Sequence, residues 1–328
     1  MTLFFDNIYI NNNAVVGGPY LIDGPLKDNF DDIYEDFYDG EKTFEDCEIK
    51  ELKKAINILM EKEEMSENEV GVILSCDLTN QIIISNFGIK EFKIPYLGIY
   101  NACASICEEY IIASSLLTNK KMNNVICTTS AHNLTSERQY RNPIEYGGPK
   151  PDYSTFTVSA STACIISNKK KGIRIESGTI GKIIDYGVKD AFDMGSAMAP
   201  AAVDTLITHL KDTKRNFDYY DLIITGDLGK YGEKIFRELL REQYNINIDN
   251  YEDSAVNIYN KDDERVYAGG SGPSCLPTYF YKKIISIMKD KKINKVLLLA
   301  TGALLSTTSV NQNKTIPCIC HAVSVEAI

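Results

Sequence analysis

Short apolar runs alternate with helical patterns along the whole chain. The runs are rich in β-branched residues and predict five strands, at residues 70–75, 94–100, 125–129, 221–225 and 296–300. Strands that are apolar throughout are buried on both faces, so they need helices to cover them. The pattern therefore predicts an α/β protein with helical layers around buried sheets.

Two further segments show the spacing of amphipathic helices. Thr43 followed by Asp46 is typical of a helix N-terminus with an acidic first turn. We interpret the apolar stripes of these helices as core surfaces without a functional role. The stripes consist of aliphatic residues three or four positions apart, namely Ile49, Leu52, Ile56 and Leu59 in one helix and Val203, Leu206, Ile207 and Leu210 in the other.

An internal repeat becomes visible when segments are aligned by structural role. Each copy has a small-residue turn (101–105 or 269–272), a helix (to about 117 or 288), a basic turn (119–124 or 289–295) and an apolar strand (125–129 or 296–300). The repeat predicts two related halves, residues 1–171 and 172–328. No Pro/Gly/Ser-rich linker separates them, so we expect one rigid body.

Composition and charge argue against several classes of function. The 328 residues carry a formal net charge of −10, which disfavours a nucleic-acid partner because phosphate backbones require a concentrated basic face. Nine scattered cysteines and an N-terminus without signal-peptide features fit a reducing compartment. No apolar run approaches the roughly 18–20 residues of a membrane span. We expect a cytoplasmic protein or one that is peripheral on a membrane.

Cys103 is the principal candidate for chemistry. It follows the predicted strand 94–100 and begins a helix whose first turn uses small residues. The positive end of a helix dipole lowers the pKa of a thiol, and nucleophilic cysteines are often placed in this way. The alternative is a buried small apolar side chain, which is what most free cysteines are, and Cys107 is interpreted as such a residue.

Covalent catalysis at Cys103 needs a base, and the chain has three histidines. His209 lies among apolar residues of a predicted helix and is interpreted as structural. His132 follows the strand 125–129, so it is expected at the same sheet edge as Cys103, where a pocket role and a structural role are equally open. His321 follows Cys318 and Cys320, but no second ligand cluster lies at zinc-site spacing. No metal or cofactor is predicted.

Other polar candidates lie at predicted strand ends and turns. The turn 269–272 lacks the Lys-Ser/Thr of a phosphate-binding loop, but its glycines allow backbone N–H groups to approach a ligand. Asp227 and the pair 301–302 also follow strands, where crevices form in α/β proteins. Arg138 and Arg141 flank Tyr140 in a polar segment. Guanidinium groups suit carboxylate ligands, and ion pairs that brace the loop are the equal alternative.

Several strings together resemble the stage V sporulation protein AD family of endospore formers. They span nearly the whole chain in order, which makes the resemblance far more specific than any single motif. The strings are GP at 18–19, GPL at 24–26, NACAS at 101–105, SAHN at 130–133, ERQYR at 137–141, EYG at 145–147, DMGSAMAPAA at 193–202, TGDLG at 225–229, AGGSG at 268–272 and ATGALLS at 300–306.

The resemblance implies a thiolase-like fold of two duplicated βαβαβαββ halves in a layered αβαβα arrangement. It also implies a sporulation function: binding of dipicolinic acid and, with membrane proteins of the same operon, uptake of calcium dipicolinate into the developing spore. Whether calcium is bound with the ligand is left open. By analogy with thiolase-like proteins we expect a homodimer.

The resemblance to thiolases and ketoacyl synthases implies that Cys103 stands where those enzymes carry an acylated nucleophile. Their second-half Gly-His-Pro base is missing, because Gly272 is followed by Pro273, and residues 300–302 lack the second thiolase cysteine. We therefore expect a noncatalytic binder. Acyl transfer on Cys103 with His132 as base is the alternative, and a docking subunit is a third. The expected ligand-binding residues are Cys103, His132, Arg138, Gly270, Ser271 and Gly272.

Overall fold

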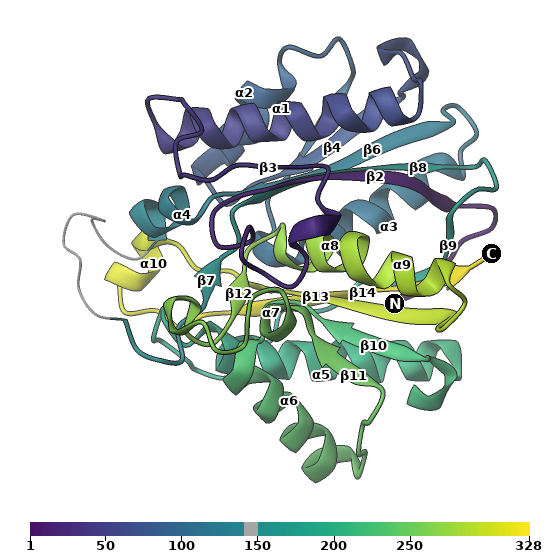
Figure 1. The fold of residues 1–328 in the computed structure, drawn as a ribbon. Helices are drawn as coiled ribbons and strands as arrows, with labels where there is room; N and C mark the ends of the chain where they lie inside the picture. The colour runs from purple at the N-terminus through teal and green to yellow at the C-terminus, as the bar shows by residue number, and fades with distance from the viewer. Residues whose placement is uncertain (141–149) are drawn as a thin grey trace.

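The computed structural model describes residues 1–140 and 150–328 (Figure 1). Ten strands follow one another across a hydrogen-bonded path in the order β11-β10-β13-β14-β9-β2-β8-β6-β4-β5. The strands of the first half of this chain are β2 (Tyr9–Gly17), β4 (Val72–Cys76), β5 (Tyr96–Ile99), β6 (Asn124–Ala131) and β8 (Ala160–Ser167).

The later half of the chain repeats this arrangement. Reading outward from the centre, the order β2-β8-β6-β4-β5 is matched by β9-β14-β13-β10-β11, with the outer three strands parallel in each. This is the duplicated architecture expected from the sequence, although the exact boundary at residue 171 stays a prediction. The strands are β9 (Ile173–Thr179), β10 (Leu222–Thr225), β11 (Tyr251–Asp253), β13 (Lys295–Ala303) and β14 (Cys318–Ala327).

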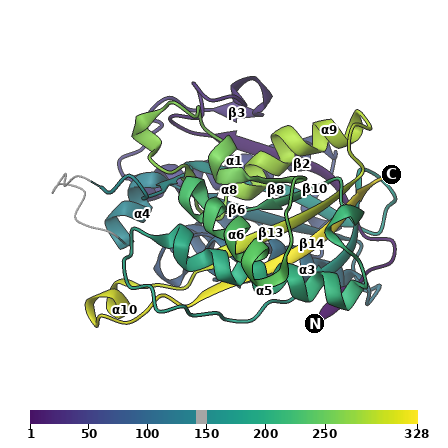
Figure 2. The same ribbon diagram turned by 90° about the horizontal axis from the view of Figure 1, so that it is seen from below.

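Helices form three layers around the strands (Figures 1 and 2). Helices α1 (Phe44–Lys62) and α2 (Ile83–Ile89) cover the outer face of the first half, and α5 (Met194–Thr213) and α6 (Gly229–Tyr244) cover that of the second. Between the strand layers lie α3 (Ser105–Leu117) and the run α8 (Cys275–Tyr279), a π-helical turn (Phe280–Ile284) and α9 (Ile285–Lys289). The fold is therefore mixed α/β in five layers.

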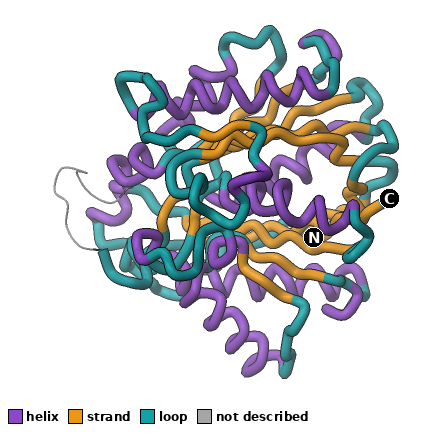
Figure 3. Tube along the Cα trace, in the orientation of Figure 1, coloured by secondary structure: helices purple, strands orange, loops and turns teal. Residues whose placement is uncertain are grey.

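Short elements complete the chain, and helices, strands and loops are distinguished by colour in Figure 3. Helix α4 (Asn133–Tyr140) follows β6, and α10 (Thr307–Asn311) follows β13. A separate two-stranded parallel pair joins the halves. The remaining elements are β1 (Thr2–Phe4), β3 (Asp32–Ile33), β7 (Phe156–Thr157), β12 (Gly270–Ser271) and α7 (Ser254–Asn257).

The hydrophobic core follows the layers. The largest cluster fills the space between the strand layers and includes Tyr110 of α3, Tyr279 of α8 and Met288 of α9. Two smaller clusters lie under the outer helices of each half. Burial of this much apolar surface on both faces explains why the predicted strands carry so few polar residues. None of the described helices has the length and apolar character that a membrane crossing requires.

Direct hydrogen bonding between the halves occurs at the centre of the strand path. Strands β2 and β9 pair antiparallel, with Tyr9 opposite Arg174 and Ile10 opposite Ile173. Each half therefore continues the hydrogen-bonded sheet of the other.

Candidate functional site

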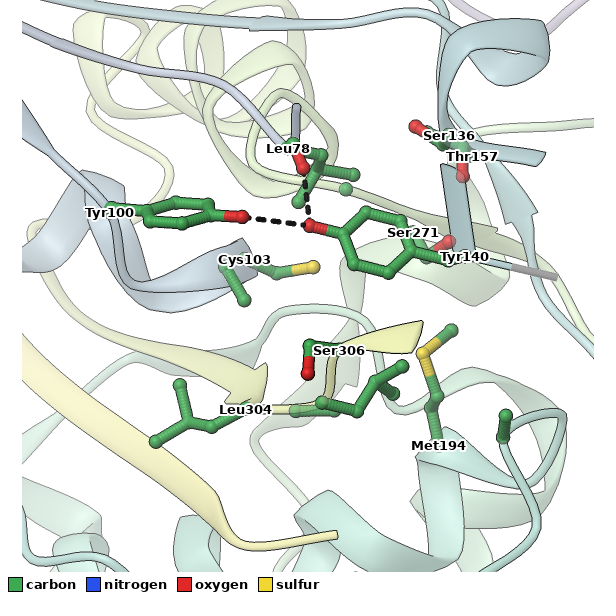
Figure 4. Close-up of a pocket in the computed structure, with 15 residues that line it drawn as sticks. Leu78, Tyr100, Cys103, Ser136, Tyr140, Thr157, Met194, Ser271, Leu304 and Ser306 are labelled. Carbon is green, nitrogen blue, oxygen red and sulfur yellow. Dashed lines mark hydrogen bonds between the residues drawn. The ribbon is translucent and has the colours of Figure 1, made fainter. Parts of the chain in front are cut away.

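A cavity of about 250 Å³ lies where the two halves meet, at the strand-end edge (Figure 4). Residues from both halves line it, and most of its surface is apolar. Among the described residues, no Lys, Arg, His, Asp or Glu side chain lines the cavity. The lining residues are Leu78, Tyr100, Ala102, Cys103, Ser136, Tyr140, Thr157, Ala191, Met194, Ser271, Gly272, Ala303, Leu304, Leu305 and Ser306.

Cys103 reaches the cavity from a tight turn between β5 and α3. The turn is a 3-10 segment, Ala102–Ala104, in which Ala102 adopts a φ of +49°, a left-handed conformation that is uncommon for a residue with a side chain. Ser105 stabilises the turn, because its hydroxyl donates to the carbonyl of Ala102 at 2.8 Å. The thiol is half-buried, while the other eight cysteines are buried. In Figure 4 the sulfur points into the space between the two tyrosine rings.

Gly302 allows this turn to pack directly on strand β13. A Cβ atom at Gly302 would lie 2.9 Å from the carbonyl oxygen of Asn101 and 3.1 Å from the amide nitrogen of Ala104. A side chain would therefore push the Cys103 turn out of place. Residues 301–302, where a crevice was expected, therefore form a packing surface beneath Cys103 instead.

The facing wall is built from backbone. Strand β12 pairs in parallel with β7, and the amide of Val158 donates to the carbonyl of Ser271 at 2.8 Å. Gly272 follows with a φ of +103°, which strongly favours glycine. Ser271 and Gly272 line the cavity opposite Cys103, so three of the six expected ligand-binding residues are brought together.

Two tyrosines form an aromatic side of the cavity. The Tyr100 hydroxyl lies 3.3 Å from that of Tyr140, and the Tyr140 hydroxyl donates to the carbonyl of Leu78 (Figure 4). Burial raises the pKa of Tyr140 well above its usual range, so this phenol is neutral and can donate. The sequence analysis singled out Tyr140 only for its arginine neighbours and missed Tyr100, whose position just before the Cys103 turn was the available signal.

Asp227 lies directly behind the cavity wall, at the end of β10. Its Oδ2 accepts a hydrogen bond from the Gly272 amide at 3.0 Å, and its carboxyl group hydrogen-bonds with the thiols of Cys103 and Cys275. Burial is the main cause that raises the pKa of Asp227 to about 8; the Cys103 contact partly opposes the rise, and the charge of Asp253 adds to it. A carboxyl group that is largely protonated at neutral pH thus adjoins two lining residues.

His132 lies outside the cavity, although it stands at the expected sheet edge. Its Nε2 lies 3.0 Å from the carbonyl oxygen of Phe37, its Nδ1 accepts from the amide of Leu134 at 3.2 Å, and its ring stacks on Phe44. Burial lowers the pKa of His132 to about 4, so the imidazole is neutral. Both ring nitrogens are engaged, Nε2 with the loop that precedes α1 and Nδ1 with the first turn of α4.

Arg138 and Gly270 also lie away from the cavity lining. Arg138 forms an ion pair with Glu45 at the start of α1, a structural ion pair with a different partner from the expected Glu137 or Glu145. Gly270 faces the interior, where a Cβ atom would meet Ile258, Val158 and Cys275. Arg141 lies outside the described residues.

The remaining histidines have structural surroundings. His209 is fully buried between the hydroxyls of Thr179 and Tyr220, at 2.7 and 2.5 Å. His321 bonds to Asn101 through Nε2 at 3.0 Å and accepts from the amide of Gly181 through Nδ1 at 3.2 Å. Burial lowers the pKa of both imidazoles to about 4. Among the described residues, no group of three or more His, Cys, Asp or Glu is placed to hold a metal ion.

Comparison with known proteins identifies the family. Residues 1–326 match the profile of the family "Stage V sporulation protein AD (SpoVAD)". A relative of that description from Bacillus subtilis (strain 168) is 40 % identical over 325 residues, which cover 99 % of this chain and 96 % of the relative.

Solved structures with the same fold include enzymes. OleA from Xanthomonas campestris superposes with a TM-score of 0.63 at 11 % identity, covering 99 % of each chain. 3-Oxoacyl-[acyl-carrier-protein] synthase III from Aquifex aeolicus VF5 gives a TM-score of 0.56 at 13 % identity, covering 97 % of this chain and 99 % of the other. At such identities the likeness concerns the fold alone, which is thiolase-like. By sequence, the chain belongs to the stage V sporulation protein AD family.

Proposed function

We propose that this chain is a noncatalytic binding protein for dipicolinate that serves the uptake of calcium dipicolinate during spore formation. The observation that carries the proposal is the cavity at the junction of the halves, which Cys103, Ser271 and Gly272 line together in a member of a sporulation family. Its volume of about 250 Å³ falls just below the range of roughly 300–1,000 Å³ typical of sites for drug-sized ligands, as suits a single-ring molecule.

The lining supplies the two kinds of contact that a pyridine dicarboxylate requires. The Tyr100 and Tyr140 rings offer aromatic faces for the pyridine ring. Hydroxyl groups of Thr157 and Ser271 are donors for carboxylate oxygens, whereas that of Ser136 donates to the carbonyl of His132 at 3.1 Å. Backbone amides at the start of α3 add the positive end of a helix dipole. His132 and Arg138 are left out of the proposed contacts because their partners hold them elsewhere.

Acyl transfer on Cys103 is the competing function. One observation favours it: the half-buried thiol at a helix start hydrogen-bonds with the Asp227 carboxyl group. Against it, none of the three histidines lines the cavity, and a condensation needs an aligned base. Incubation with acyl-CoA followed by intact mass measurement separates the two, because acyl transfer requires an adduct on Cys103 and binding does not.

Calorimetry with dipicolinate tests the proposal directly. We expect saturable binding by the wild type, a loss of at least about tenfold in affinity for Cys103→Phe, which fills the cavity, and a change below about threefold for the matched variant Cys103→Ser. Titrations with and without calcium show whether the chelate or the free acid is the ligand. No heat at millimolar dipicolinate contradicts the proposal.

We further propose a homodimer that pairs through the edge strand β5, and contact with membrane proteins of the sporulation machinery. Among the described strands, β5 bonds only to β4, and a group of large apolar side chains beside it is exposed. An unpaired edge with exposed apolar residues is suited to strand pairing. Sedimentation should show a dimer that Leu97→Lys weakens. The group comprises Ile83, Phe87, Leu97 and Tyr100.

A further inference from the structure

A buried carboxyl group, that of Asp227, adjoins the cavity wall. This side chain is 1 % exposed, and it contacts two residues that line the cavity, Cys103 through its thiol and Gly272 through its amide. An ionised Asp227 would place a negative charge behind the surface on which the proposed anionic ligand rests. A protonated Asp227 leaves that surface uncharged.

The groups that face Asp227 come from four elements. They are the Cys103 thiol from the turn before α3, the Gly272 amide after β12, the Cys275 thiol at the start of α8, and the Asp253 carboxyl at the end of β11. None of these four groups is a cation. Oδ1 of Asp227 has no nitrogen or oxygen donor among the described residues. Nothing in this set stabilises a carboxylate as well as water does.

Asp253 differs from Asp227 because it is richly hydrogen-bonded. Its two oxygens accept from the Thr225 hydroxyl at 2.7 Å and from the amides of Leu228, Gly229 and Ala255 at 3.2, 3.0 and 3.1 Å. Burial raises the pKa of Asp253 to about 6, against about 8 for Asp227. Because the two neighbouring carboxyl groups have unequal surroundings, Asp253 ionises at lower pH, and Asp227 keeps its proton at neutral pH.

We propose that the cavity binds its carboxylate ligand together with the proton on Asp227, so that affinity falls when Asp227 ionises. This inference rests on the proposed function, since it requires an anionic ligand in this cavity. Two like charges separated by one layer of protein atoms repel strongly in a buried site. We therefore expect wild-type affinity for dipicolinate to fall by at least about tenfold between pH 6.5 and pH 9.5.

The test is calorimetry with dipicolinate at both pH values on the wild type, Asp227→Asn and the control Asp262→Asn. Asparagine keeps the size of the side chain and an oxygen that can accept from Gly272, but it cannot ionise. Its affinity should stay within about twofold across the range and exceed that of the wild type at pH 9.5. Asp262→Asn makes the same chemical change at an exposed aspartate outside the cavity lining and should keep the wild-type profile.

A second measurement needs no variant. Titrations of the wild type at pH 8 in buffers of different ionisation enthalpy should reveal net proton uptake on binding. Circular dichroism confirms that each protein is folded at each pH.

The possible outcomes are distinct. A wild-type affinity that does not change with pH, without proton uptake, overturns the inference and leaves the proposed function intact. A wild-type pH profile retained by Asp227→Asn, or loss of binding by the folded variant at both pH values, also overturns it. If the wild type binds dipicolinate at no pH, the proposed function itself fails.

Discussion

The two turns that face each other across the cavity hold corresponding places in the duplicated fold but present different chemistry. The first, around Ala102 and Cys103, offers a thiol, while the second, from Gly269 to Gly272, offers the Ser271 hydroxyl and the backbone of Gly272. Each leads into a helix that lies between the strand layers. Both need left-handed backbone, which the first obtains from an alanine and the second from glycines. The two turns thus share a place in the duplicated fold, but the backbone that leads to them differs, since α7 and β12 intervene between β11 and α8.

The two turns also differ in the space that they leave for a Cβ atom. At Ala102 a Cβ atom is present although φ is +49°. At Gly269, where φ is +127°, a Cβ atom would lie 2.4 Å from the carbonyl oxygen of Ala255. The first turn therefore has room for sequence change, and the second is fixed by close backbone packing.

The largest expected effect is on stability at the second turn. Gly269→Ala combines a forbidden backbone conformation with a collision against main chain, and we expect it to lower the free energy of unfolding by on the order of 3 kcal/mol. Urea denaturation measures the loss. Gly40→Ala is the matched control, since φ is +78° there with nothing within 4 Å of a Cβ atom, and it should cost only about 1 kcal/mol. Equal losses for both would show that the contact with Ala255 is unimportant.

A second prediction concerns the cysteines of the two turns. Cys103 is half-buried at the cavity, whereas Cys275 is buried and burial raises the pKa of its thiol well above the usual range. Iodoacetamide should therefore modify Cys103 at least about tenfold faster than Cys275 in the folded protein. Peptide mass mapping over time measures both rates, and the unfolded protein serves as the control in which they converge. Faster labelling of Cys275 would mean that the second turn opens in solution.

The smallest effect is expected at the first turn. Ala102→Gly removes the energetic cost of the left-handed conformation in the folded state, but it also raises the conformational entropy of the unfolded chain. These two contributions to the free energy of unfolding have opposite signs and nearly cancel. We expect a change in unfolding free energy within about 0.5 kcal/mol and an unchanged affinity for dipicolinate. A large loss of affinity with intact stability would show instead that the strained alanine is needed to aim Cys103.

Sequence patterns predicted much of the fold because the responsible forces are local. Thr43 begins α1 as expected, with its hydroxyl accepting from the Asp46 amide at 3.1 Å, and Cys107 is a buried core residue. The predicted strands appear with shifted ends, such as Tyr96–Ile99 in place of 94–100. Helix α5 starts much earlier than its apolar stripe, at Met194, and includes Pro200, because tertiary packing overrides the low helix propensity of proline.

The site was less accessible to sequence reasoning because side-chain direction depends on distant partners. His132 was placed at the right sheet edge, but its ring contacts Phe37 of the loop before α1 and Phe44 at the start of α1, both distant in sequence. Arg138 is held by Glu45 from the same region. Asp227 was noticed only as a strand-end residue, and its approach to Cys103 depends on how the two halves dock.

The hydrogen bonds between β2 and β9 bear on how a ligand enters. Since Tyr9 and Ile10 pair with Arg174 and Ile173, the strands of the two halves are joined by backbone hydrogen bonds, and separating the halves would strip partners from both at once. The cavity is therefore pre-formed, which means that it is present before a ligand binds. Opening a hinge along β2 and β9 to admit a ligand would cost these hydrogen bonds.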